Sequence, residues 1–346
     1  MKTRGEGQMA VEKETGSPKT TSTAPPAVWQ ASSDRGMAVA RWAMLGLLVL
    51  MAVVFSLVIP NLFFTFQNLK VILSTQAVTA ILAVGMVFPL IIGMFDLSVA
   101  AICGVGQLLF VVFTAYYHLP VPVAAVAAVL VCLVIGAVNG LLVTRIGINA
   151  FISTLGMATL LGGLMIGFTG GKTISAGIPH SLTSIARGTF LGVPLSVYYM
   201  IVIAAVGWYV LEHTPYGRYL YAIGGSKEAA RLAGVNVRRL TFSCFMVSAL
   251  LGAIAGLLTA SRMGSGDPTT GPSFLLPVLA GALLGAAAYK PGTYNIAGTI
   301  IAVFTLAVGV TGLQLLGAPF WIESVFNGAA LIIAVGVTRY LQKEAL

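Results

Sequence analysis

Two acidic residues, Asp96 and Glu323, are candidates for chemistry because each lies beside a long apolar stretch. An ionisable side chain inside a membrane is costly and therefore often functional. Asp96 is followed by Leu97 and Ser98, so its carboxylate could instead cap a helix that begins there. Glu323 lies in the first turn of a predicted helix, where the helix dipole favours an acid. We expect a capping role for Asp96 and a helix-dipole role for Glu323, and keep a transport role open.

Histidine and cysteine show no pattern of a reactive site. The three histidines lie in separate connections, and the three cysteines lie inside apolar runs: His118, His180, His213, Cys103, Cys132 and Cys244. None has a partner at the spacing of a metal site, a catalytic Ser/His/Asp arrangement or a disulfide framework. We therefore predict no metal, no cofactor and no catalytic residue in this chain.

One tripeptide is similar to the end of a phosphate-binding loop. Gly171-Lys172-Thr173 has the right residue types, but Ile166 occupies the position where that loop needs its first glycine. The tripeptide is also predicted to lie outside the membrane, away from cytoplasmic ATP. We therefore predict that the chain has no ATP site and is not an enzyme.

Small and hydroxylated residues recur within the apolar runs. They could line a path for a polar solute, or they could pack helices against each other, which is their common role in membranes. For any single position we favour packing. The candidates for a path, besides Asp96, are Asn139, Ser153, Thr154, Asn295, Thr299 and Asn327.

The connection between residues 213 and 240 predicts a short surface helix. Ser226 can cap it, Glu228 lies in its first turn, and Gly234 can end it. So short a helix needs packing to be stable. Its small residues Ala229, Ala230 and Ala233 suit insertion into a groove of a partner, whereas the alternative is an ordinary connector. The residues alone favour the connector.

These elements belong to a membrane protein. Of the 346 residues, 58% are hydrophobic and 8% are charged, against about 25% charged in soluble domains. A membrane span needs about 20 apolar residues. The sequence predicts an all-α membrane protein with about ten spans, at Trp42–Ile59, Val71–Gly93, Leu97–Tyr117, Val121–Val143, Phe151–Phe168, Leu195–Leu211, Thr241–Ala260, Phe274–Ala288, Ile296–Leu316 and Trp321–Val337.

The positive charges set the predicted orientation. With both termini in the cytoplasm and ten spans, only Lys70, Lys172, Arg187 and Arg262 of the 19 Lys and Arg residues lie outside, as the positive-inside rule requires. The net charge of +9 therefore reflects topology rather than nucleic-acid binding. The predicted organisation is a disordered cytoplasmic tail (1–40), a permease domain (41–338) with a cytoplasmic connection (213–240), and a short cytoplasmic tail (339–346).

Several segments resemble one family of membrane transporters. Residues 222–258, which include Ser226-Lys227-Glu228-Ala229-Ala230-Arg231, resemble the coupling-helix region of ABC importer permeases of the ribose, xylose and arabinose type. The segment GMFDLSVA from Gly93 resembles that family's Gly-Gly-Ile-Asp-Leu-Ser-Val-Gly. Residues 149–164 and 266–302 resemble two further stretches, so the resemblance runs from about Asn68 to Arg339.

The sequence departs from the family pattern at a few positions. Gly285-Ala286 stands where a pair of glycines is usual, Ala100 replaces a glycine, and Met94-Phe95 replaces a smaller pair. Each change enlarges a side chain where backbones could approach closely. These changes affect the detailed geometry and leave the class of protein unaltered.

The resemblance implies a type II-like ABC importer permease fold and a small sugar as cargo, a pentose, hexose or related polyol. Its implied partners are a cytoplasmic ATPase that binds ATP and Mg, an extracytoplasmic sugar-binding protein, and a second permease copy or homologue. Coupling to the ATPase is assigned to Ser226, Lys227, Glu228, Ala229, Ala230, Arg231 and Gly234. Docking of the binding protein is assigned to Lys172, Arg187 and Arg262.

Two alternatives remain. One is a secondary carrier driven by an ion gradient, although such a carrier usually needs several acids within the membrane. The other is an ABC permease for branched-chain amino acids. Replacement of Ala230 by a bulky charged residue is expected to uncouple the ATPase from transport. The cell (inner) membrane is the predicted location.

Overall fold

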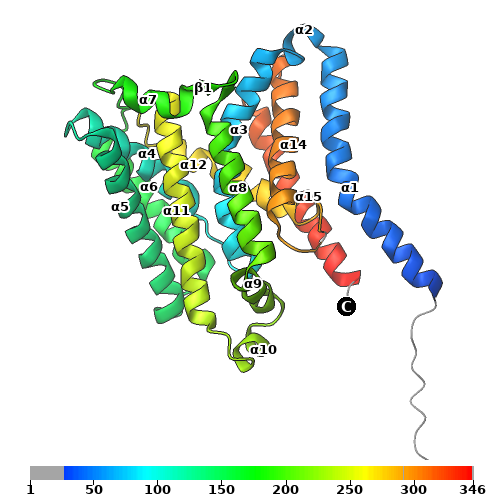
Figure 1. Cartoon of the computed structure of the whole chain (residues 1–346). Coiled ribbons are helices and arrows are strands. Elements are labelled where there is room, and N and C mark those ends of the chain that lie inside the picture. The colour runs from blue at the N-terminus through cyan, green and yellow to red at the C-terminus, as the bar shows by residue number, and fades with distance from the viewer. Residues whose placement is uncertain (1–26, 291, 345–346) are drawn as a thin grey trace, which may run out of the picture.

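Nearly every apolar segment forms a helix in the computed structural model, which describes residues 27–290 and 292–344 (Figure 1). In chain order the elements are α1 (Ala27–Val58), α2 (Pro60–Phe63), α3 (Phe66–Ile91), α4 (Ser98–Ala115), α5 (Val121–Leu141), the π-helical turn η1 (Leu142–Ile146), α6 (Ala150–Thr169), α7 (His180–Arg187), β1 (Thr189–Phe190), β2 (Val193–Pro194), α8 (Leu195–His213), α9 (Pro215–Gly225), α10 (Lys227–Leu232), α11 (Val237–Met263), α12 (Thr270–Ser273), α13 (Leu275–Gly285), α14 (Ile296–Leu315) and α15 (Ile322–Glu344).

Seven helices in the described part of the chain are long and apolar enough to cross a membrane. They are α3, α4, α5 with η1, α6, α8, α11 and α14. Three of the predicted spans correspond to shorter apolar helical segments, at Trp42–Val58, Thr270–Gly285 and Ile322–Ile333. A mostly helical chain with seven candidate membrane spans is therefore confirmed, whereas the count of ten spans stays a prediction.

The first and last helices extend beyond the predicted domain boundaries. Helix α1 begins at Ala27, so residues 27–40, which were predicted to be a disordered tail, are helical. Helix α15 runs to Glu344, past the predicted boundary at residue 338. Once a helix has formed in the membrane, each added residue contributes one more backbone hydrogen bond, so the helix can continue into polar sequence. Residues 1–26 and 345–346 of the predicted tails lie outside the described residues.

Helix α11 lies among α3, α4 and α5 and packs against all three. Small residues make these contacts possible, as is usual for helices in a membrane. A Cβ atom on Gly256 of α11 would lie 2.4 Å from the carbonyl oxygen of Cys103 on α4. One on Gly136 of α5 would lie 2.3 Å from the Cβ of Ala249. The backbones of these helices therefore approach more closely than larger side chains would allow.

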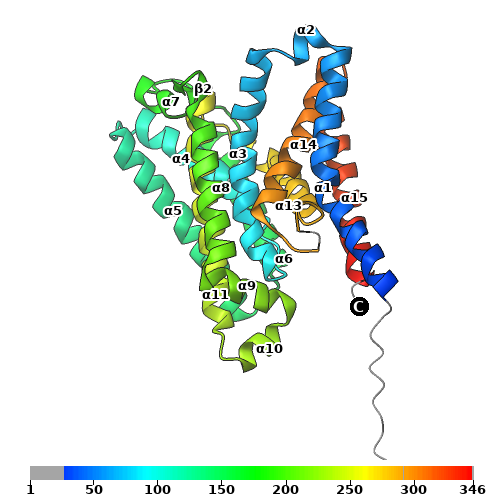
Figure 2. The same ribbon diagram turned by 45° about the vertical axis from the view of Figure 1, so that its right-hand side comes forward.

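A second group of helices packs against α3 from the other side, as Figure 2 shows. Helix α13 contacts α14 and α15, and α1 lies along α14. The outward faces of α1, α5, α6 and α8 carry large apolar side chains that remain exposed, among them Leu57, Val134, Leu164 and Val202. Lipid is the solvent that such faces require.

The two ends of the bundle differ. The end that carries α2, α7 and β1 is called the outer end here, and the end that carries α9 and α10 the inner end, following the predicted orientation (Figure 1). At the outer end β1 and β2 form a hairpin, and Ile174 pairs with Gly266. The C-terminal end of α15 lies toward the inner end, as does the beginning of α1.

Both long connections contain more structure than predicted. The outer connection, residues 170–194, includes α7 and the hairpin, and the inner connection includes α9 in addition to the predicted short helix. At the inner end, Lys290 forms an ion pair with Glu212 at the end of α8. The backbone polar groups of these segments are satisfied by local helices and turns, as backbone at a membrane boundary requires.

Candidate functional site

Helix α10 has the ends that its sequence predicts. The Ser226 hydroxyl accepts a hydrogen bond from the Ala229 amide at 3.2 Å, and Glu228 lies in the first turn. Gly234 follows in the left-handed conformation, at φ +84°, which glycine adopts without steric cost. The short surface helix predicted between Ser226 and Gly234 is confirmed, while its coupling role stays a prediction.

Helix α9 connects α10 to two membrane helices through tyrosine hydroxyls. The Tyr216 hydroxyl lies 2.8 Å from that of Ser243 on α11, and the Tyr221 hydroxyl donates to the carbonyl of Tyr294 at 2.9 Å. Burial raises the pKa of Tyr221 to about 12, so this donor keeps its proton at physiological pH. Helix α9 was not predicted from the sequence, although Pro215 at its first position is a recognised start signal.

Gly224 brings the end of α9 directly against α3. A Cβ atom at Gly224 would lie 2.0 Å from the carbonyl oxygen of Ile91, the last residue of α3. At the neighbouring Gly225, nothing lies within 4 Å of the same added atom. Helix α9 therefore needs a glycine at one of the two positions, and the contact gives α10 a rigid connection to the inner end of α3.

The faces of α10 differ from those predicted. Ala230, which was predicted to insert into a partner, is only 5% exposed and packs against its own chain. Its carbonyl also accepts the Val235 amide at 3.0 Å, which closes the helix end. Leu232 was not singled out in the sequence, yet it is 89% exposed. Of these two residues, only Leu232 is accessible to a partner.

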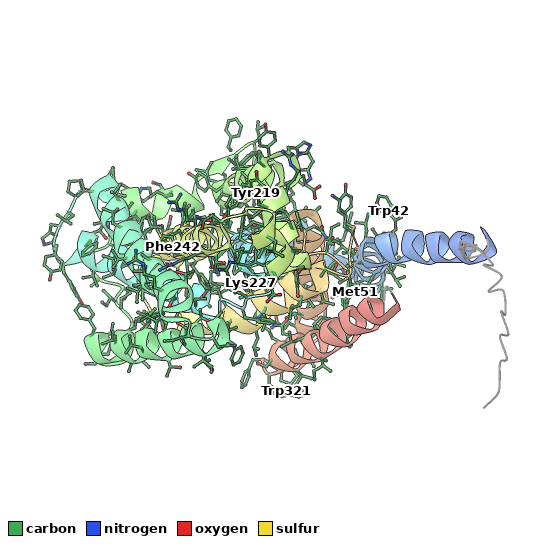
Figure 3. The ribbon with its side chains drawn as sticks, turned by 90° about the horizontal axis from the view of Figure 1, so that it is seen from below. Trp42, Met51, Tyr219, Lys227, Phe242 and Trp321 are labelled. Carbon is green, nitrogen blue, oxygen red and sulfur yellow. The ribbon has the colours of Figure 1, made fainter. Side chains whose placement is uncertain are left out.

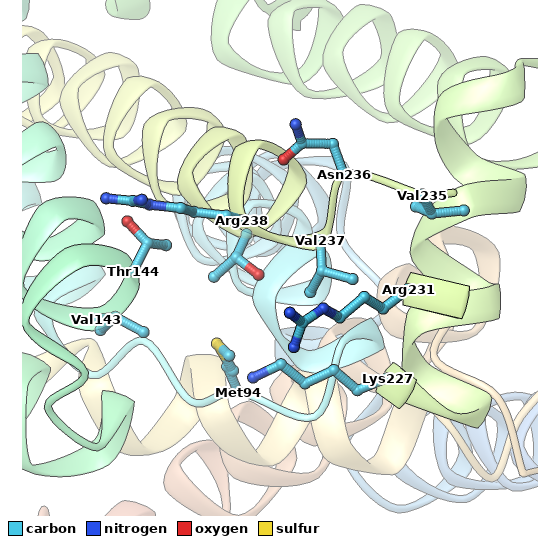
Figure 4. Close-up of a pocket in the computed structure, with 10 residues that line it drawn as sticks. Met94, Val143, Thr144, Lys227, Arg231, Val235, Asn236, Val237 and Arg238 are labelled. Carbon is cyan, nitrogen blue, oxygen red and sulfur yellow. The ribbon is translucent and has the colours of Figure 1, made fainter. Parts of the chain in front are cut away.

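A basic cavity of about 400 Å³ lies between α10 and the start of α11 (Figure 4). The side chains of Lys227 and Arg231 extend from α10 toward it, and Arg238 extends from α11. No acidic residue is found among those that line it. Lys227 lies toward the middle of the inner face when the molecule is viewed from that end (Figure 3). The inner face therefore presents concentrated positive charge beside α10.

Asp96 belongs to a buried hydrogen-bonded cluster. Its Oδ1 accepts from the Ser98 amide at 3.0 Å and from the Ser98 hydroxyl at 2.6 Å. The Asn139 side-chain amide of α5 donates to the same hydroxyl at 2.8 Å. Asp96 is 1% exposed and Asn139 is fully buried. The carboxylate satisfies the first turn of α4 and, through Ser98, connects that turn to α5.

Thr154 supports the same segment from α6. Its hydroxyl accepts from the Leu97 amide at 3.1 Å and lies within hydrogen-bonding distance of the Ala150 carbonyl, at 2.8 Å. Ser153, its neighbour, is buried, and its hydroxyl has no partner among the described residues. Asp96, Asn139 and Thr154 therefore come together around the start of α4.

Asn295 joins the end of α13 to the start of α14. Its side-chain oxygen accepts from the Gly298 amide at 2.7 Å, and its amide group donates to the carbonyls of Ala288 and Thr293 at 3.1 and 3.0 Å. The Thr299 hydroxyl donates to the Asn295 carbonyl at 2.9 Å. These two candidates for the path are engaged in capping and in helix packing.

The three outer cations predicted for docking differ in exposure. Lys172 is exposed. Arg187 is exposed, but its guanidinium donates to the carbonyls of Arg262 and Met263 at 2.8 and 2.9 Å, at the end of α11. Arg262 is partly buried and turns inward, where it donates to the Thr75 hydroxyl at 3.1 Å. Arg187 and Arg262 are therefore held by contacts within the chain.

Asn327 lies apart from the other path candidates, in a cavity of about 220 Å³ between α3, α14 and α15 that Glu323 also lines. The seven predicted path residues thus occupy three places in one chain: the start of α4, the junction of α13 with α14, and this cavity. Within residues 27–290 and 292–344 no group of three His, Cys, Asp or Glu side chains has the arrangement of a metal site.

Comparisons with known proteins agree on one family. The model of the family described as "Branched-chain amino acid transport system / permease component" matches residues 68–335. The chain is 32% identical to the ribose import permease protein RbsC of Haemophilus influenzae, over 87% of this chain and 94% of that protein. It is 34% identical to RbsC of Escherichia coli K12, with the same coverage. It is also 34% identical to the L-arabinose transport system permease protein AraH of that strain, over 87% of this chain and 92% of AraH.

Proposed function

The chain belongs to the family of branched-chain amino acid transport system permease components, and from this premise we propose that it is the membrane-spanning permease subunit of an ATP-driven importer of a small sugar. The observation that carries the proposal is the similarity to ribose and L-arabinose permeases along almost their whole length. Those relatives favour a sugar over a branched-chain amino acid as cargo. The proposed solute is a pentose, a hexose or a related polyol.

The work of transport is proposed to enter this chain from a separate cytoplasmic ATPase, which binds ATP and Mg. Helix α10 is the contact point, because it protrudes from the inner end and presents Leu232 to a partner. The basic cavity beside α10 is lined by Lys227, Arg231 and Arg238. Its charge favours an acidic surface on the ATPase around the site that would receive Leu232. Ser226 and Gly234 fix the ends of the helix and act indirectly.

The transmission path is proposed to run from α10 through α9 into the membrane helices. Gly224 lies against the end of α3, Tyr216 is bonded to α11, and Tyr221 is bonded to the segment before α14. A displacement of α10 therefore acts on three membrane helices together. Conformational changes in packed proteins occur by such rigid shifts of whole elements.

Binding-protein docking is proposed for the outer end, with Lys172 as its exposed cation. Arg187 contributes mainly by holding α7 against α11, so its loss would alter the shape of the docking surface rather than remove one ion pair. An exposed ion pair at Lys172 is worth about 0 to 1 kcal/mol, and shape therefore matters more than charge at this end. A second permease copy or homologue would complete the translocation path.

The test is a substitution of Leu232 in the membrane-embedded chain. Burying a leucine contributes about 1.5 to 3 kcal/mol, which corresponds to a roughly ten- to hundredfold change in affinity. Leu232→Glu should weaken binding of the ATPase by at least about tenfold and abolish ATP-driven uptake of ribose or L-arabinose in proteoliposomes. Leu232→Met should retain both, because the apolar contact remains.

A bulky charge at Ala230 is a less informative test than Leu232→Glu. Ala230 is buried against its own chain, so a charge there would displace α10 itself and cause loss of function whatever α10 binds. Uptake that is unchanged in Leu232→Glu would overturn the coupling role. Uptake by the wild-type chain that requires an ion gradient and no ATPase would instead establish a secondary carrier.

A further inference from the structure

A cavity lies between α3, α14 and α15, three helices whose arrangement Figure 2 shows from the side. Polar side chains from all three helices line it, among them Thr75, Gln76, Thr79, Gln314, Glu323 and Asn327. Thr75 and Gln76 belong to the first half of α3 and Thr79 lies at its middle, Gln314 lies at the end of α14, and Glu323 lies in the first turn of α15. Apart from Thr79, each of these positions is nearer to the outer than to the inner end of its helix.

Helical spacing turns these side chains toward the same space. Residues four apart lie on one face of a helix, and both Thr75 and Thr79 on α3 and Glu323 and Asn327 on α15 have this spacing. Asn327 is 4% exposed, so its side-chain amide is almost entirely buried. Such a placement is costly unless the amide has a partner.

Most of these polar groups have no partner in the described part of the chain. Thr75 accepts a hydrogen bond from Arg262, whereas no hydrogen bond to a described residue is found for Gln76, Thr79 or Asn327. Thr305 on α14 gives the contrast: it is also 4% exposed, but its hydroxyl donates to the Ile301 carbonyl at 2.7 Å. Threonines in membrane helices commonly make that local bond. The cavity therefore contains hydrogen-bonding side chains that no described residue of the protein satisfies.

The chemistry of the lining selects among solutes. Amides and hydroxyls both donate and accept hydrogen bonds, as do the hydroxyl groups of a sugar, and the aliphatic part of the lining, including Leu306 and Val310, suits the C–H faces of a sugar ring. No Lys, Arg or His lines the cavity, which disfavours an anion. A volume of about 220 Å³ is below the range of pockets for drug-sized ligands.

We propose that this cavity is a binding station for a neutral polyhydroxylated solute of monosaccharide size, the first that the solute reaches after entering from the outer end. The inference rests on the proposed function and adds to it the residues that hold the cargo. Gln76 and Asn327 are assigned the direct hydrogen bonds, Thr79 a further one, and Arg262 positions Thr75. The station does not include α10, which lies at the inner end of the bundle. Binding of the solute and coupling to ATP can therefore be tested separately.

The experiment compares two threonines with equal burial. Thr79→Val and Thr305→Val are made in the full chain, reconstituted with its ATPase and binding protein, and uptake of ribose, L-arabinose and fructose is measured. Thr79→Val should lower the uptake rate several-fold, with thermal stability unchanged or higher, because it removes a hydroxyl without a partner. Thr305→Val should leave uptake within about twofold. A double variant, Gln76→Leu with Asn327→Leu, should lower uptake by at least about tenfold.

Each result decides for or against the station. ATP hydrolysis stimulated by the binding protein should stay within about twofold of wild type in all these variants, which separates them from Leu232→Glu. Normal uptake in the double variant would overturn the station while leaving the permease function intact. Glu323→Gln should keep uptake within about threefold, since an amide also bonds hydroxyls. A much larger loss would mean that the cavity needs a negative charge, and the assignment to a neutral solute would be wrong.

Discussion

At the scale of single residues, Asp96 is the position where capping and transport lead to different expectations. Its Oδ1 accepts two hydrogen bonds from Ser98, and Asn139 completes the cluster through the Ser98 hydroxyl. A cap requires an oxygen that accepts hydrogen bonds, whereas a role in moving a charged or protonated species requires an ionisable group. Asparagine keeps the first property and loses the second.

The effect of an Asp96 substitution on uptake and stability should therefore depend on whether a hydrogen-bond acceptor remains, and not on whether the charge remains. Asp96→Asn should retain sugar uptake within about threefold and cost only a few tenths of a kcal/mol, because Asn caps helices about as well as Asp. Asp96→Ala should lower stability by about 1 to 2 kcal/mol, measured by thermal unfolding of the solubilised protein. Loss of uptake in a stable Asp96→Asn protein would show that the charge itself is required.

A residue's role can be predicted from the sequence when its hydrogen-bonding partner lies close to it along the chain. The local bond of Asp96 can be read from the chain, because the Ser98 amide from which it accepts lies two residues away, although the N-cap position of α4 itself is Leu97 and not Asp96. Asn295 caps the helix that follows it, but its bond to Ala288 depends on how the chain turns between α13 and α14. That partner has no signal in the sequence. The exposed Leu232 and the buried Ala230 likewise became distinguishable only through packing.

At the scale of elements, the Gly224–Gly225 pair provides a matched test of transmission. A Cβ at Gly224 would meet the Ile91 carbonyl at 2.0 Å, and one at Gly225 would meet nothing within 4 Å. Gly224→Ala should shift α9 away from α3 and lower the uptake per ATP hydrolysed, by about fivefold or more, since a backbone contact cannot yield as a side chain does. The ATPase should still bind, because Leu232 remains exposed.

Gly225→Ala is the control for that measurement, because both changes add one methyl group to the same helix end. It should leave uptake, hydrolysis and thermal stability close to wild type. Equal losses in the two variants would mean that flexibility of the glycine pair, rather than the contact with α3, is what transport needs. Equal and normal activity would remove α9 from the proposed transmission path.

Long apolar segments are the elements that the sequence predicts best. Apolar runs of span length identify α3, α4, α5, α6, α8, α11 and α14, because the bilayer imposes both length and composition. Helix α9 and the β1–β2 hairpin lie outside that constraint, and both depend on contacts with other elements, such as those of Tyr216. The cavity on α3, α14 and α15 combines residues more than 200 positions apart, from Gln76 to Asn327, so it could not be found by spacing along the chain.

At the scale of the whole molecule, contacts at the two ends show how the short α12–α13 segment is placed. Before it, Gly266 pairs with Ile174 at the outer end. After it, Lys290 pairs with Glu212 at the inner end of α8. The segment Thr270–Gly285 therefore connects the two ends of the bundle although it is shorter than an ordinary span. A crossing at this position is the step on which a ten-span topology depends, since without it the final helices would be inverted.

Cysteine labelling tests that crossing in the intact chain, because Cys103, Cys132 and Cys244 are fully buried and should give little background. Lys172→Cys, Leu232→Cys and Lys290→Cys are each treated with a membrane-impermeant maleimide in sealed vesicles of both orientations. With a crossing, Lys290→Cys should be labelled from the same side as Leu232→Cys and from the side opposite to Lys172→Cys, since charged and exposed connections lie in water on one side or the other. Labelling of Lys290→Cys together with Lys172→Cys would make α12–α13 a re-entrant segment, reverse the sides of α14 and α15, and place the mouth of the solute cavity at the cytoplasmic end.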